Sequence, residues 1–137
     1  MGLYSLRGLH LENTVLFLES VQVIQAAVAF PGAPAAQSQF AKLLVGWHEC
    51  GGTTVGVTIP GTGTIPFSVS PPRDAGNGVS TMDLVPAGLQ IRSARAIATK
   101  TNVIVDLYVS CSGTTDGDRP RQSAVSIVNY VLDKIPG

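Results

Sequence analysis

Hydrophobic and polar positions follow two different periods along this chain. Apolar residues alternate loosely over residues 3–12 and more regularly over residues 21–30, which is the pattern of half-buried strands that can pair as a hairpin. A Pro-Gly pair ends the second run. Over residues 34–50 the spacing changes to three and four, with a proline in the first turn and two glycines after the end. This segment is therefore predicted to be an amphipathic helix. Its apolar stripe consists of Ala36, Phe40, Leu43, Leu44 and Trp47.

The middle of the chain predicts short strands separated by turn-forming residues. The candidates are residues 53–59, 64–72 and 79–87, and a stretch rich in Pro, Gly, Asn and Asp separates the last two. Several prolines fall in or beside these segments and predict edge or irregular strands, because proline cannot donate a hydrogen bond to a sheet. Two longer apolar runs, residues 89–100 and 102–111, are predicted to be the last two strands.

Residues 122–137 return to the helical period. The order of elements is therefore β-β-α-β-β-β-β-β-α. Consecutive strands with short turns predict an antiparallel sheet, and two amphipathic helices can cover one face of it. We expect an α+β fold, with an antiparallel β-sheet packed against two amphipathic helices. The apolar face of the closing helix is formed by Ala124, Val125, Val128, Val131, Leu132 and Ile135.

Composition narrows the classes of function. The chain has 137 residues, which argues for a single domain, and only 13% of them are charged, with a net charge of zero. There is thus no basic footprint for nucleic acid and no polybasic arm for an anionic membrane. The sequence also has no apolar run long enough to cross a bilayer and no signal peptide at its start. We therefore expect no nucleic-acid partner.

Motifs that carry catalysis or bind metals are missing from the sequence. The two histidines, His10 and His48, have no partner at metal-ligand spacing, and the neighbours of His48 point in different directions on a helix. The Gly-Thr-Gly-Thr run at residues 61–64 lacks the third glycine of a dinucleotide loop, because Pro66 occupies that position, and strands follow it. No Gly-x-Ser-x-Gly elbow is present. We expect no catalytic residues, no metal and no cofactor.

One acidic residue lies inside the most apolar strand. Asp106 shares a strand face with Ile104 and Tyr108, so that face is not plainly exposed to solvent. The carboxylate either faces water or forms an ion pair with Arg92 or Arg95 on the neighbouring strand. The pattern favours an ion pair or a hydrogen-bonded carboxylate over a catalytic acid.

Three stretches together resemble a known family. Residues 21–52 resemble a strand, a Phe-Pro turn and a helix that ends in Trp-x-x-Cys. Residues 91–111 resemble paired late strands with an Arg-Ala step and an Asn-Val-Ile-Val-Asp core, and residues 122–137 resemble a closing helix. In this order they are similar to the extracytoplasmic sensor domain of mycobacterial receptor-type serine/threonine kinases and related mycobacterial lipoproteins. The similarity covers residues 20–137 and is poor over residues 60–88.

The resemblance implies a domain outside the membrane, held by a tether that lies outside this chain, with a cleft between sheet and helices. It also implies two disulfides, and Cys50 and Cys111 match the second cysteine of each. The partner of Cys111 would stand where this chain has Ser93, and the partner of Cys50 would precede residue 1. We therefore expect a single domain over residues 1–137 that lacks the N-terminal segment of the family. Its two cysteines would be free thiols or would pair with each other, and a free thiol argues against an oxidising compartment.

The favoured hypothesis is a non-enzymatic, extracytoplasmic ligand-binding or sensory module, secreted or in the cell envelope, whose partner is an unknown small molecule or lipid. The residues expected to line its cleft are Trp47, Arg95, Asp106 and Tyr108. Two alternatives remain. One is an interaction module that forms a homo-oligomer through an exposed sheet edge. The other is a small hydrolase or thiol enzyme that uses Cys50 or Cys111, for which a depressed thiol pKa would be the signature.

Overall fold

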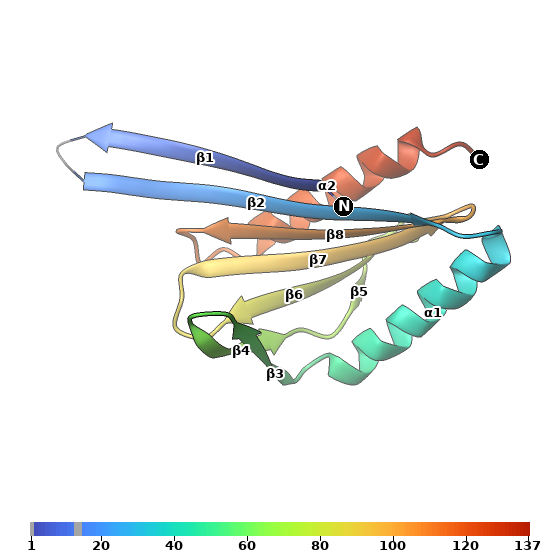
Figure 1. Ribbon diagram of the computed structural model, residues 1–137, viewed down its shortest axis with the longest axis horizontal. Coiled ribbons are helices and arrows are strands. Elements are labelled where there is room, and N and C mark those ends of the chain that lie inside the picture. The colour runs from blue at the N-terminus through green and yellow to red at the C-terminus, as the bar shows by residue number, and fades with distance from the viewer. Residues whose placement is uncertain (1, 13–14) are drawn as a thin grey trace.

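The computed structural model describes residues 2–12 and 15–137, with side chains described from residue 21 onward. One sheet runs through the molecule, and the two long helices lie on either side of it (Figure 1). None of the described helices is long and apolar enough to span a membrane. The elements are β1 (Gly2–Glu12), β2 (Val15–Ala29), α1 (Ala33–Cys50), β3 (Thr54–Ile59), β4 (Gly63–Val69), β5 (Arg73–Asp74), β6 (Ser80–Pro86), β7 (Ile91–Lys100), β8 (Val103–Ser112) and α2 (Asp118–Lys134).

The strands form a single antiparallel sheet in the order β1-β2-β8-β7-β6-β4-β3. The predicted α+β fold and the predicted order of elements are therefore confirmed. The structure adds the two-residue strand β5, which lies in a segment predicted to be a turn and pairs with β6. The turn itself lies between them, where Asn77 adopts a φ of 55° between two glycines of positive φ.

The first two strands form the predicted hairpin, but β2 is longer than predicted. Residues 15–20 pair with β1 alone, residues 21–25 pair with both β1 and β8, and residues 26–29 pair with β8. The hairpin therefore extends past the end of β8, as Figure 1 shows for the strands drawn in blue. The predicted start at residue 21 coincides with the point where β2 joins the rest of the sheet.

The two helices pack on opposite faces of the sheet, which corrects the expectation that they share one. Alternate residues of a strand point to opposite faces. On β8, Val105, Leu107 and Val109 pack against α2 residues such as Val128. On β7, Ile97 packs against Trp47 of α1. β7 carries buried alanines toward α2 and the buried Ile97 toward α1, as expected for a strand that is covered on both faces.

A close backbone contact sets the position of the end of α1. A Cβ atom on Gly51 would lie 2.8 Å from the Cα atom of Pro71, so only glycine fits there. The amide of Gly51 donates to the carbonyl of Trp47, and the amide of Gly52 donates to the carbonyl of Val69 in β4. These contacts attach the last turn of α1 to the sheet and hold Trp47 against it.

Candidate functional site

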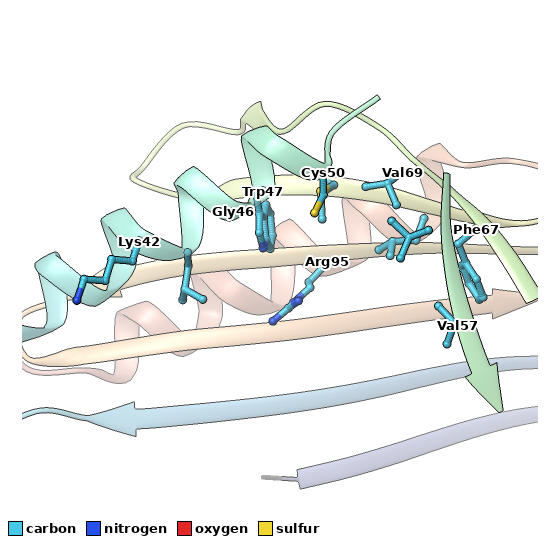
Figure 2. A pocket seen from close by; sticks show the side chains of 12 residues that line it. Lys42, Gly46, Trp47, Cys50, Val57, Phe67, Val69 and Arg95 are labelled. Atoms are coloured by element: carbon cyan, nitrogen blue, oxygen red, sulfur yellow. The ribbon is translucent and has the colours of Figure 1, made fainter. Parts of the chain in front are cut away.

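An apolar pocket of about 380 Å³ lies between α1 and the sheet (Figure 2). The helix forms one wall, and strands β3, β4, β6 and β7 form the floor and the opposite wall. The lining side chains are nearly all apolar. They belong to Lys42, Leu43, Trp47, Cys50, Val55, Val57, Phe67, Val69, Met82, Leu84 and Arg95, with Gly46 completing the helical wall.

The helical wall is open because of a glycine in the middle of α1. Gly46 precedes Trp47, and a Cβ atom built on Gly46 would meet no atom within 4 Å. Glycine inside a helix costs stability relative to alanine. No neighbouring atom would clash with a side chain at Gly46, and the lack of a side chain at this position leaves space in the pocket.

The opposite wall is the β3–β4 hairpin. Val55 pairs with Phe67, and Val57 pairs with Ile65, so these apolar side chains share the face of the sheet that carries α1. Val55 and Val57 are 37% and 38% exposed. This wall is an apolar surface that α1 does not cover.

A second, more polar pocket of about 340 Å³ adjoins the first. Leu84 and Arg95 line both pockets, so the two form one continuous groove on this face of the sheet. The other residues of the second pocket are Ile24, Ala26, Asp106 and Tyr108, from β2 and β8.

Arg95 and Asp106 form a two-pronged ion pair at the polar end of this groove. Nε of Arg95 donates to Oδ1 of Asp106 over 2.9 Å, and Nη2 donates to Oδ2. The hydrogen bond to Asp106 raises the pKa of Arg95. The guanidinium also lies over the ring of Trp47, 5.5 Å from its centroid, which is a cation–π distance. The predicted cross-strand ion pair is therefore present, and Arg95 rather than Arg92 is the partner.

The hydroxyl of Tyr108 is held by a short chain of hydrogen bonds. It donates to Oγ of Ser93 over 2.9 Å, and Ser93 in turn donates to Oγ of Ser110 over 3.2 Å. Because Tyr108 donates its one proton to Ser93, its oxygen still offers lone pairs toward the groove.

The structure brings the four predicted cleft residues together. Trp47 and Arg95 line the apolar pocket, and Arg95, Asp106 and Tyr108 line the polar one. Sequence reasoning missed the opening at Gly46 and the wall formed by Val57 and Phe67. Two signals were available in the sequence. One is a glycine within the helical pattern, and the other is a pair of valines at alternate positions of a short predicted strand. The ligand-binding role of the four residues remains a prediction.

Both cysteines are free thiols on opposite sides of the sheet. Cys50 is exposed and lines the apolar pocket, whereas Cys111 is buried in the core beneath α2. Burial raises the pKa of the Cys111 thiol, which is the opposite of the depressed value expected for a nucleophile. The resemblance placed the family partner of Cys111 at Ser93. However, Ser93 pairs with Ser110, and Cys111 with Arg92, so Ser93 and Cys111 point to opposite faces.

Neither His10 nor His48 was predicted to bind a metal. The side chain of His10 lies outside the described ones, and His48 is exposed in the last turn of α1. Among the described residues, no group of three or more potential ligands could hold a metal ion. The Gly-Thr-Gly-Thr run forms the turn between β3 and β4, as expected, with Gly61 and Gly63 at positive φ.

The fold is that of the extracellular domains of receptor-type serine/threonine kinases. Residues 2–134 match the family described as the PknH-like extracellular domain, and the chain belongs to this family. The serine/threonine-protein kinases PknJ of Mycobacterium tuberculosis and Mycobacterium bovis are each 40% identical to it over 119 residues. This match covers 85% of the chain and 20% of each kinase, so the chain spans about a fifth of the length of these relatives. The family resemblance expected from the sequence is confirmed.

A solved structure shares the fold. The crystal structure of the extracellular domain of PknH from Mycobacterium tuberculosis matches with a TM-score of 0.70 at 23% identity. The match covers 96% of this chain and 62% of the PknH chain.

Proposed function

We propose that this domain is a non-enzymatic sensor module, secreted or held in the cell envelope, that binds a small molecule or lipid in the groove between α1 and the sheet. The observation that carries this proposal is the apolar pocket of about 380 Å³ that opens into a polar one. Binding sites for small molecules are commonly apolar clefts of this size with a few polar groups that fix orientation.

The exposed apolar wall supports the same function. Val55 and Val57 remain more than a third exposed, although α1 lies on the same face of the sheet. Leaving apolar area in water forgoes about 25 cal/mol per Å². A ligand that covers these side chains would recover that free energy, so the open wall favours occupancy.

The polar groups in the groove suit binding better than catalysis. The carboxylate of Asp106 is held by both prongs of Arg95, and the hydroxyl of Tyr108 is engaged with Ser93. A fixed ion pair and a fixed hydroxyl present donors and acceptors in defined positions, which is what orienting a ligand requires. We assign these residues to orientation of the ligand.

The relatives are serine/threonine-protein kinases of which this region is a small part. Under the proposal, the domain reports occupancy of its groove to a tethered partner that lies outside this chain. The partner would detect a change at α1, which forms one wall of the groove.

Cys50 provides a direct test, because its thiol lines the pocket while Cys111 is buried. The rate of alkylation at each cysteine is measured by mass spectrometry, with and without an organic-solvent extract of a mycobacterial envelope. We expect the extract to slow alkylation of Cys50 and to leave the slow reaction of Cys111 unchanged.

Gly46→Leu is the matched variant with less space in the pocket. The new side chain has space and occupies part of the pocket, so the extract should slow alkylation of Cys50 less in this variant than in the wild type. Val45→Leu adds bulk to the exposed side of the same helix and should behave as the wild type. Equal Cys50 rates with and without extract in the wild type would contradict the proposal.

A second candidate function, self-association, is favoured by the sheet edge. β3 is an edge strand, and all six of its residues are exposed. Unpaired edge strands can pair with another chain. Light scattering over a range of protein concentrations tests this directly. A particle mass that rises with concentration in the absence of ligand would support self-association, and a constant monomer mass would exclude it.

A further inference from the structure

The groove has a defined polarity from one end to the other, and we infer that its ligand is a single-chain amphiphile with a neutral, hydroxylated head. The apolar tail lies between α1 and the β3–β4 hairpin, and the head contacts Arg95, Asp106 and Tyr108. This inference rests on the proposed function and specifies the class of ligand.

The apolar pocket sets the size of the tail. Its floor and far wall are formed by aliphatic and aromatic side chains such as Val57, Phe67 and Met82. A water-sized group occupies about 30 Å³, so a pocket of about 380 Å³ holds roughly a dozen groups the size of a methylene. This volume fits one alkyl chain of medium length and not two.

The polar end determines the charge of the head. Arg95 and Asp106 neutralise each other through two hydrogen bonds, and no other ionisable group among the described residues lines that pocket except Tyr108. An anionic head would lie against the carboxylate of Asp106 without a free cation to pair with it. Burying an unpaired charge is costly, whereas a neutral head leaves the ion pair intact.

The same residues offer both donors and acceptors. Arg95 has five N–H groups, and the two hydrogen bonds to Asp106 leave others available. The side chains of Arg95 and Asp106 are 37% and 30% exposed, so a ligand can reach both. The oxygen of Tyr108 accepts as well. Adjacent donors and acceptors complement a hydroxyl group, which both donates and accepts.

A second cation in the groove, Lys42, could instead bind an anionic head. Lys42 lines the apolar pocket from α1 and is exposed. An amphiphile with a carboxylate or phosphate head could enter with the opposite orientation and pair with Lys42. The test must therefore distinguish a neutral head at Arg95 from an anionic head at Lys42.

The experiment compares two probes with chains of similar length, octyl glucoside and octanoate, both kept below their micelle concentration. Trp47 is the only tryptophan of the chain and lines the pocket, so its fluorescence reports occupancy. Calorimetry gives the dissociation constants. We expect octyl glucoside to bind at least about tenfold more tightly than octanoate. Glucose alone, which lacks the tail, should leave the fluorescence of Trp47 unchanged.

Two variants sharpen the comparison. Asp106→Asn removes the carboxylate and leaves Arg95 unbalanced, so the preference should shift toward octanoate by about tenfold. Gly46→Leu takes up part of the apolar pocket and should weaken binding of both probes, while Val45→Leu should leave both unchanged. Circular dichroism confirms that each variant is folded.

The outcomes separate this inference from the proposed function. Equal or tighter binding of octanoate, especially if Lys42→Gln abolishes it, would overturn the neutral head while leaving the groove as a ligand site. Binding of neither probe to the wild type would overturn the amphiphile, and the Cys50 alkylation experiment would then decide separately whether the groove binds a ligand.

Discussion

The two faces of the sheet are built from alternate residues of the same strands, yet they differ in packing. On the face toward α2, Ala94, Ala96 and Ala98 of β7 are fully buried, and α2 lies along β7 and β8. On the face toward α1, the next residues of β7 include the ion-paired Arg95, and much of the surface is left uncovered. The helix on the first face closes a core, whereas the helix on the second forms one wall of a groove.

The difference separates stability from function within one sheet. A helix packs closely where the strand residues beneath it are small, and alanines provide that on the α2 face. On the α1 face, the large side chain of Trp47 is the main buried anchor, and Gly46 beside it leaves space. We expect substitutions on the α2 face to reduce stability and substitutions on the open part of the α1 face to affect ligand binding.

The largest expected effect is the contrast between Leu107 and Val57. Leu107 is fully buried under α2, so Leu107→Ala should lower the free energy of unfolding by about 2–5 kcal/mol. Val57 is 38% exposed in the groove wall, and Val57→Ala should change the free energy of unfolding by about 0.5 kcal/mol. Urea unfolding measures both values. Similar losses for the two variants would show that the groove wall is part of the stabilising core.

The ion pair of the groove should contribute less. A double-mutant cycle with Arg95→Gln and Asp106→Asn should give a coupling free energy of about 1 kcal/mol, because both side chains are about a third exposed. The control is the pair of Arg121 with Asp118 on α2, in which Asp118 is 63% exposed and Arg121 is shared with Asp83, and its coupling should be below about 0.5 kcal/mol. A coupling near zero for Arg95 and Asp106 would mean that solvent screens the pair completely.

The opening in α1 should cost stability. Gly46→Ala should raise the free energy of unfolding by about 0.5–1 kcal/mol, because alanine favours the helix and its Cβ atom meets no neighbour. Gly51→Ala is the contrasting change and should destabilise the protein, since its Cβ atom would approach Pro71 to 2.8 Å. Thermal unfolding compares the two. Loss of stability in Gly46→Ala would show that the space is required by the fold.

The smallest effect is the pH dependence contributed by Cys111. Burial raises its pKa in the folded protein, so the folded state keeps the proton at pH values where the unfolded chain has lost it. The stability from this thiol is full below the unfolded pKa of about 8.5 and is lost as the pH rises through the folded value. Cys111→Ala should therefore show a shallower alkaline loss of stability than the wild type. Urea unfolding at a series of alkaline pH values measures this slope in both proteins.

The period of the sequence was sufficient to predict the elements and their order except for β5, and the position of Asp106 favoured an ion pair without deciding between Arg92 and Arg95. Asp106 lies between Ile104 and Tyr108 on one strand face, so it was expected to need a partner on the next strand. The sequence did not reveal that the helices take opposite faces. Alternation shows which residues of a strand share a face, but it does not show which helix covers that face.

The groove was only partly predictable for a similar reason. Trp47 and Arg95 come from different elements, and their neighbours Val57 and Phe67 come from two more. Contacts among four elements depend on the strand order, which no local pattern of residues specifies. The family resemblance placed the partner of Cys111 at Ser93, but Ser93 points to the other face of the sheet. A shift of one residue in register changes the face to which a side chain points.

Native mass spectrometry after incubation with a mycobacterial envelope extract tests the central claim most directly. The claim is that the groove beside α1 is a ligand site. We predict an added mass on the wild-type protein that leaves on denaturation, persists in Val45→Leu and is carried by a smaller fraction of Gly46→Leu. A bare wild-type protein, or an equal loaded fraction of Gly46→Leu, would contradict the claim.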